Sequence, residues 1–241
     1  MDDRVLTRSG TLRYFVPGGG YNRVRWGAAS GPSITRAKVV TPSLQARRAD
    51  AEVVPRGQGS SLFTPTQFQV WMPRKPLPLD EGEEIEFQAA EDGVAATVLN
   101  GFVALGVDPL PAMPDGDVIA IRATGTTTLT VFAWTAIALT LESSLPAGTY
   151  ALVGLVAGSA NAVAVRARMR GSEFRPGTLA TNGTEALGAD FDPASLWPLM
   201  GYNMGSFKST EIPELEYFAT VADTVEYAWL YAVRTGPLAA A

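Results

Sequence analysis

The sequence predicts an all-β protein, a β-sandwich of the jelly-roll type with an extended N-terminal arm. Three observations support this fold class. The 24 glycines and 17 prolines among 241 residues are scattered along the chain, as expected for many short strands joined by turns. Several segments alternate apolar and polar residues with a period of two. Neither a convincing helical pattern nor a repeat of fixed period occurs, which argues against propellers and solenoids.

Residues 1–61 are predicted to form a basic arm with loops. A short extended piece, Thr11–Val16, ends at Pro17-Gly18-Gly19-Gly20, where glycine permits positive φ. A second extended segment is expected at Ala37–Leu44. The polar, glycine-rich stretch Arg47–Ser61 is expected to be a loop.

The charge of the chain is unevenly distributed. Residues 1–50 hold nine basic and three acidic side chains, a net charge of +6, whereas the whole chain carries −5 and residues 51–241 therefore carry −11. A basic arm on an acidic body can associate with another copy or meet an anionic surface such as nucleic acid or lipid. The alternative is a solvated strand face without a partner.

Residues 62–235 are predicted to be the sandwich domain, and residues 236–241 a disordered tail. Apolar alternation and turn residues place ten strands in the domain. These are Gln67–Met72, Glu84–Ala89, Val94–Val107, Val118–Ala123, Leu129–Leu141, Thr149–Ala157, Ala162–Met169, Tyr202–Lys208, Leu215–Thr220 and Thr224–Arg234. Asp92-Gly93 predicts a hairpin between the second and third strands, and Gly158–Asn161 predicts another between the sixth and seventh.

The last predicted strand, Thr224–Arg234, is apolar on both faces. Tyr227, Trp229 and Tyr231 share one face, and the other carries small or aliphatic residues such as Leu230. Such a strand belongs in the middle of a sheet. The uncharged runs 123–141 and 143–165 are also read as strands and not as membrane spans, because threonine, proline and glycine interrupt them.

The absence of two residue types restricts the chemistry. There is no cysteine and no histidine. Disulfides, thiolate metal sites, cysteine nucleophiles and a Ser-His-Asp triad are therefore excluded, and the commonest general base is missing. The chain is not expected to be an enzyme, and no catalytic, cofactor or metal residue is assigned.

Weaker candidates each have a simpler structural explanation. Carboxylates near one another are Asp108, Asp115 and Asp117, then Asp190 and Asp192, then Glu211, Glu214 and Glu216. A calcium cage needs more oxygens than the first two groups offer, and a glycosidase pair is a weak hypothesis in an acidic protein. The five tryptophans, Trp26, Trp71, Trp134, Trp197 and Trp229, more often fill cores than stack on sugars. Asn182-Gly183-Thr184 fits the glycosylation pattern but is more simply a turn.

Residues 80–235 resemble the jelly-roll capsid proteins of tailless, icosahedral bacterial and archaeal viruses. The similarity lies in the stretch Leu145–Leu155, the hairpin after it, Phe174-Arg175-Pro176-Gly177 and the aromatic strand around Trp229. It implies a shell-forming subunit, arranged as trimers or pseudo-hexamers, with no catalytic residues.

The function predicted from the sequence is that of a structural, self-assembling subunit of a viral capsid. Its partners would be copies of itself, as trimers or larger assemblies, and other coat proteins, with an anionic surface as a further partner of the arm and no small-molecule substrate. It would be located in the virion, and in the host cytoplasm during assembly. The alternatives are a carbohydrate-binding or phage tail-associated β-sandwich, and a glycoside-active enzyme that uses two carboxylates.

Overall fold

The computed structural model divides the chain into two compact units, Met1–Pro109 and Leu110–Ala241. The residues that the structure describes are 13–30, 34–47, 51–53, 70–71, 76–91, 100–107, 109–159, 161–172, 175–182, 196–219, 221–224 and 227–237.

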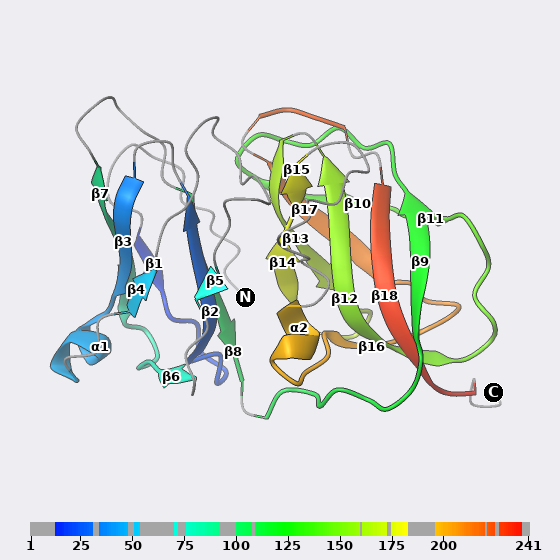
Figure 1. The fold of residues 1–241 in the computed structure, drawn as a ribbon, viewed down its shortest axis with the longest axis horizontal. Coiled ribbons are helices and arrows are strands. Elements are labelled where there is room, and N and C mark those ends of the chain that lie inside the picture. The colour runs from blue at the N-terminus through cyan, green and yellow to red at the C-terminus, as the bar shows by residue number, and fades with distance from the viewer. Residues whose placement is uncertain are drawn as a thin grey trace. The chain divides into compact units, whose positions relative to one another are not determined.

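The first unit is a small antiparallel two-sheet structure (Figure 1). Its elements are β1 (Arg13–Phe15), β2 (Arg23–Ser30), β3 (Ile34–Val40), α1 (Pro42–Ala46), β4 (Ala51–Val53), β5 (Val70–Trp71), β6 (Leu77–Pro78), β7 (Glu84–Glu91) and β8 (Asn100–Gly106). One sheet has the order β1-β7-β3-β4, and in the other β2 pairs with β5, β6 and β8. The turn after β1 uses positive φ at Gly19 and Gly20, as the sequence predicts.

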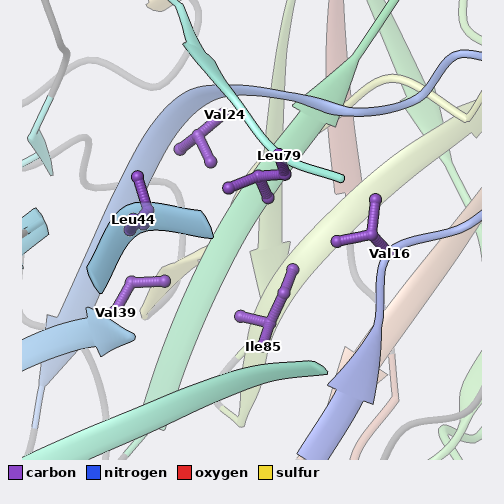
Figure 2. Close-up of a cluster of buried hydrophobic side chains, with 6 residues drawn as sticks. All are labelled: Val16, Val24, Val39, Leu44, Leu79 and Ile85. Atoms are coloured by element: carbon purple, nitrogen blue, oxygen red, sulfur yellow. The ribbon is translucent and has the colours of Figure 1, made fainter. Parts of the chain in front are cut away.

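Side chains from both sheets make the core of the first unit (Figure 2). The buried members are Val16, Val24, Val39, Leu44, Leu79 and Ile85. β2 contributes Val24, whereas β3 and β7 contribute Val39 and Ile85. Leu44 comes from α1, which begins where Thr41 accepts a hydrogen bond from the Leu44 amide and a proline follows. The apolar faces of two sheets are thus buried against each other, as in a sandwich.

The second unit contains eleven named elements within its described residues. They are β9 (Val118–Thr124), β10 (Trp134–Ile137), β11 (Thr140–Leu141), β12 (Thr149–Ser159), β13 (Ala162–Arg168), β14 (Gly177–Leu179), β15 (Thr181–Asn182), α2 (Leu196–Leu199), β16 (Gly205–Lys208), β17 (Glu214–Ala219) and β18 (Tyr227–Gly236). All named strand pairs are antiparallel except β12–β15.

The eight main strands of this unit follow the jelly-roll order. One sheet is β9-β18-β12-β16, with β11 beside β9 and β15 beside β12, and the other is β10-β17-β13-β14. Ranked along the chain, these strands form sheets 1-8-3-6 and 2-7-4-5, which is the double Greek key of a jelly roll. The predicted all-β, jelly-roll sandwich is therefore confirmed in the second unit.

The last strand lies in the middle of its sheet, as predicted. β18 pairs with β9 on one side and β12 on the other (Figure 1). Leu230 in β18 and Leu155 and Val156 in β12 are fully or almost fully buried. In the facing sheet, Val165 and Tyr217 are equally buried. The inner faces of the two sheets make the core between them.

Both predicted hairpins are wrong, and for the same reason. β7 is flanked by β1 and β3, so β8 pairs with β2 in the other sheet. Likewise β12 is flanked by β18 and by β16 and β15, so β13 joins the opposite sheet beside β17. Because both edges of β7 and β12 already have partners, the next strand must cross to the other layer.

The domain boundaries also differ from the prediction. The predicted arm, residues 1–61, contains β1 to β4, and β1, β2 and β3 pair with strands of residues 76–106. The observed division at Pro109 lies between the predicted strands Val94–Val107 and Val118–Ala123, and not near residue 61. Residues 238–241 of the predicted tail lie outside the described residues, and β18 extends to Gly236.

Three local predictions need smaller corrections. The segment Ala37–Leu44 is a strand only to Val40, since α1 begins at Pro42. The run Leu129–Leu141 is split into β10 and β11, which belong to different sheets. The loop predicted at 47–61 contains β4, and the stretch 171–200, where no strand is predicted, contains β14, β15 and α2.

Candidate functional site

The outer face of the β10-β17-β13-β14 sheet carries a ladder of cross-strand ion pairs. Arg168 and Arg170 contact Glu214 and Glu211, with nitrogen–oxygen distances of 3.4 and 2.9 Å. Arg166 Nε lies 2.5 Å from the carboxylate of Glu216. Because alternate residues of a strand point to one face, these pairs follow one another along β13 and beyond its end. We call these three pairs the ion-pair ladder.

The first pair of the ladder is the most buried. The side chains of Arg166 and Glu216 are 11% and 13% exposed, against 52% and 42% for Arg168 and Glu214. The Arg166 guanidinium lies 4.2 Å from the ring centroid of Trp134, and that ring is 5.7 Å from the ring of Phe218. The aromatic rings remove water from this pair, which strengthens its attraction and raises the cost of breaking it.

The ladder accounts for the acidic residues considered as a glycosidase pair. Glu211, Glu214 and Glu216 each face an arginine on the outer surface of the sheet. A retaining or inverting glycosidase needs two carboxylates that flank a substrate. Here each carboxylate is engaged with an arginine of β13 or of the residues just after it, so the pairs join the segments of β13 and β17.

The tryptophans do not form a shared platform within the described residues. Trp26 and Trp197 are buried, and the Trp197 indole donates to the Gly177 carbonyl at 2.9 Å. Trp134 lies beneath Arg166, and Trp229 has the Arg122 guanidinium 5.8 Å from its ring centroid. The side chain of Trp71 lies outside what the structure describes.

The other candidates from the sequence are the aspartates and the glycosylation pattern. Asp115 and Asp117 are exposed in the loop before β9, whereas Asp108, Asp190 and Asp192 lie outside the described residues. Within the described ranges, no group of three or more carboxylates is placed to hold a metal ion. Asn182, in β15, pairs with Ser159 of β12, and Gly183 and Thr184 are outside the described residues. None of the described helices is both long and apolar enough to cross a membrane.

Two polar clusters fix turns, and the first is centred on the Asp223 carboxylate. The Asp223 carboxylate accepts from Ser159 Oγ at 2.5 Å and from the Asn161 amide at 2.9 Å, which holds the crossing between β12 and β13.

In the second unit, burial and then the nearby Tyr227 raise the pKa of Tyr217. That phenol therefore stays neutral in the core.

In the first unit, the Glu83 carboxylate holds the start of α1. It accepts from the Ser43 hydroxyl and amide at 2.5 and 2.7 Å and from the Asp80 amide at 2.7 Å. Burial by itself raises the pKa of Glu83, but the hydrogen bonds from Ser43, Asp80 and Thr41 outweigh it and lower the pKa below 4.5.

Exposed apolar side chains gather at one end of the second unit. Val131, Phe132 and Val221 are 41%, 45% and 51% exposed, and we call them the apolar tip. Their segments lie side by side, since Val131 bridges Ala219 and the Phe132 amide donates to the Ala219 carbonyl at 2.8 Å. Phe132 has φ of 56°, a strained left-handed value for a residue with a side chain.

A second apolar surface is the start of β9. Val118 and Ile119 are 50% and 37% exposed. β18 pairs with all of β9 on one side, but on the other side β11 covers only Ala123 and Thr124. The sequence predicts this strand but not its exposure, because a sequence pattern does not tell which edge of a strand is open. The sequence does not predict the exposure of Val131 and Phe132 either, because both fall within the predicted strand Leu129–Leu141.

These features define an all-β protein whose second unit is a jelly roll, with ion pairs and hydrogen-bonded carboxylates that join neighbouring segments and with exposed apolar side chains. No protein-family model matches the sequence, and no curated protein matches it. Among solved structures, the chain is similar to the major capsid protein P2 from bacteriophage PM2. The match has 14% sequence identity and a TM-score of 0.26, and it covers 95% of this chain and 93% of that one.

Proposed function

We propose that the chain is a structural subunit of a viral capsid that assembles with copies of itself through its β-sandwich units. The observation that carries the proposal is the pair of exposed apolar surfaces of the second unit, the apolar tip and the start of β9. Exposed apolar side chains that lie next to one another on a folded surface are a common feature of protein contacts. The backbone strain at Phe132 supports the same conclusion. Strained conformations are found most often at functional positions, and the exposed phenyl ring of Phe132 does not serve the core.

The described polar residues support a structural role as well. The ion-pair ladder, the Asp223 cluster and the Glu83 cluster each join neighbouring segments of the fold. A shell subunit needs a rigid body with several modest contact surfaces, since closed symmetry multiplies each one. We therefore propose that the chain is not an enzyme and is located in the virion.

The test is the size of the purified protein, measured by light scattering and negative-stain microscopy at several concentrations. We expect trimers or larger assemblies, and uniform particles at high concentration. Phe132→Ser should lower the assembled fraction at least tenfold without lowering the melting temperature, because the side chain is exposed. Thr126→Ser is a matched control at another exposed position. A chain that stays monomeric at every concentration tested contradicts the proposal.

A further inference from the structure

The start of β9 presents unpaired backbone groups in a defined pattern. In an antiparallel strand the N–H and C=O of one residue point to the same side. The Arg122 carbonyl points away from β18, since it accepts from the Glu142 amide at 3.0 Å. Val118 and Ala120 therefore point their N–H and C=O groups outward too, and no described strand pairs with them there.

We propose that this edge pairs with the same edge of a second copy of the chain, across a two-fold axis at Ile119. The proposal rests on the proposed self-assembly and names one of its contacts. A two-fold axis through an antiparallel pair runs perpendicular to the sheet, so it pairs residues that share a face. With the axis at Ile119, Val118 of each copy faces Ala120 of the other. All four outward N–H and four outward C=O groups then have partners within the pair.

The side chains around the axis fit a second copy. Ile119 would face its own counterpart as a non-hydrogen-bonded pair, in which α-carbons approach to about 4.5 Å. No residue from Val118 to Ile121 is charged, and none is a proline that would block pairing. Two isoleucines that face each other would cover the exposed part of each side chain.

The charges at the two ends favour the antiparallel arrangement. Exposed Asp117 precedes the open edge, and Arg122, which is paired with Glu142 at 3.0 Å, follows it. In the antiparallel pair, the two Asp117 carboxylates lie at opposite ends of the contact, and each lies near Arg122 of the other copy. A parallel pair would bring the two carboxylates together. The pairing edge also ends before Asp117, because Gly116 has φ of 136° and interrupts the extended backbone there.

The absence of cysteine allows a direct test by disulfide cross-linking. Single cysteines at Ile119, Val118, Ala120 and the exposed control Ser144 are introduced into the full chain and oxidised with glutathione disulfide. We expect Ile119→Cys to form covalent dimers at least tenfold faster than Ser144→Cys. Val118→Cys and Ala120→Cys should be slower than Ile119→Cys, since neither faces its own counterpart. Equal rates for Ile119→Cys and Ser144→Cys would overturn the proposal.

A second variant keeps the test independent of cysteine chemistry. Ala120→Asp puts a charge at an exposed position of the edge, and sedimentation should show at least a tenfold weaker self-association than the wild type, with an unchanged melting temperature. Particles that form normally with Ala120→Asp would exclude the edge contact and leave the capsid proposal intact. Cross-linked dimers without any larger assembly would support the edge contact and contradict the capsid proposal.

Discussion

Two ion pairs of the same ladder differ mainly in burial, and burial decides how much each contributes. Glu216→Gln leaves the Arg166 guanidinium without its carboxylate in a site covered by Trp134. We expect a loss of about 3–5 kcal/mol in the free energy of unfolding, as for other broken buried pairs. Glu214→Gln removes the partner of the exposed Arg168 and should cost about 0–1 kcal/mol. Urea unfolding of both variants at neutral pH measures the difference.

A double substitution separates two causes of destabilisation. One is the lost attraction between Arg166 and Glu216, and the other is the cost of leaving one charge of that pair buried. Replacing Arg166 by Met together with Glu216→Leu removes both buried charges. Such apolar replacements restore much of the stability that a single change removes. Equal losses for Glu216→Gln and Glu214→Gln would contradict the importance of burial at this pair.

Glu83 gives the first unit a predictable dependence on pH. Its pKa is lowered in the folded state, so its contribution to stability is present above the pKa of the unfolded chain and is lost as the pH falls through the folded value. Glu83→Gln should destabilise the start of α1 by about 1–3 kcal/mol at pH 7, because Gln is uncharged and has one acceptor oxygen where Glu83 accepts from Ser43 and Asp80 through two.

Hydrogen exchange of the Ser43 amide is the local measurement for this prediction, since that amide donates to Glu83 at 2.7 Å. The amide should exchange faster in Glu83→Gln than in the wild type at pH 7. Urea unfolding from pH 7 to pH 3 should show a smaller acid-dependent loss in the variant. The same acid-dependent loss in both proteins would show that other carboxylates cause it.

At the scale of elements, the centre of the large sheet is expected to be the most sensitive region. Leu230 in β18 is almost fully buried between β9 and β12. Leu230→Ala should cost about 2–5 kcal/mol, through lost burial and the cavity left behind. Trp229→Ala should cost less than its size implies, because the ring is only partly buried and lies beneath Arg122. The urea midpoints of the two variants measure this, and a larger loss for Trp229→Ala would contradict it.

Strands were easier to predict from the sequence than the pairing of those strands. The period of two in β7 and β18 depends only on neighbouring residues, so it is visible in the sequence. β2 was missed because the alternation of Val24 and Trp26 with arginines is short and runs into small residues. Partners depend on which edges remain free after distant strands have paired, which explains why both predicted hairpins are wrong.

The candidate surfaces were harder still to predict. Val131 and Phe132 look like core residues in the sequence, but both are exposed, at a turn where Phe132 has a left-handed backbone. The ion-pair ladder was equally hidden, since Arg166 and Glu216 are fifty residues apart and meet only through the register of β13 with β17. The acidic residues were noticed, but their partners were not.

At the scale of the whole molecule, the second unit is expected to fold without the first. Every strand of Leu110–Ala241 in the described sheets pairs within that unit, and β9 to β18 supply both layers of its core. Residues 110–241 expressed alone should therefore show a cooperative urea transition and a near-ultraviolet circular dichroism spectrum of fixed aromatic packing. Leu230→Ala in this fragment should lower the free energy of unfolding by about 2–5 kcal/mol, as in the full chain, since both strands that pair with β18 belong to the second unit. A fragment without a cooperative transition would show that the second unit needs the first to form its core.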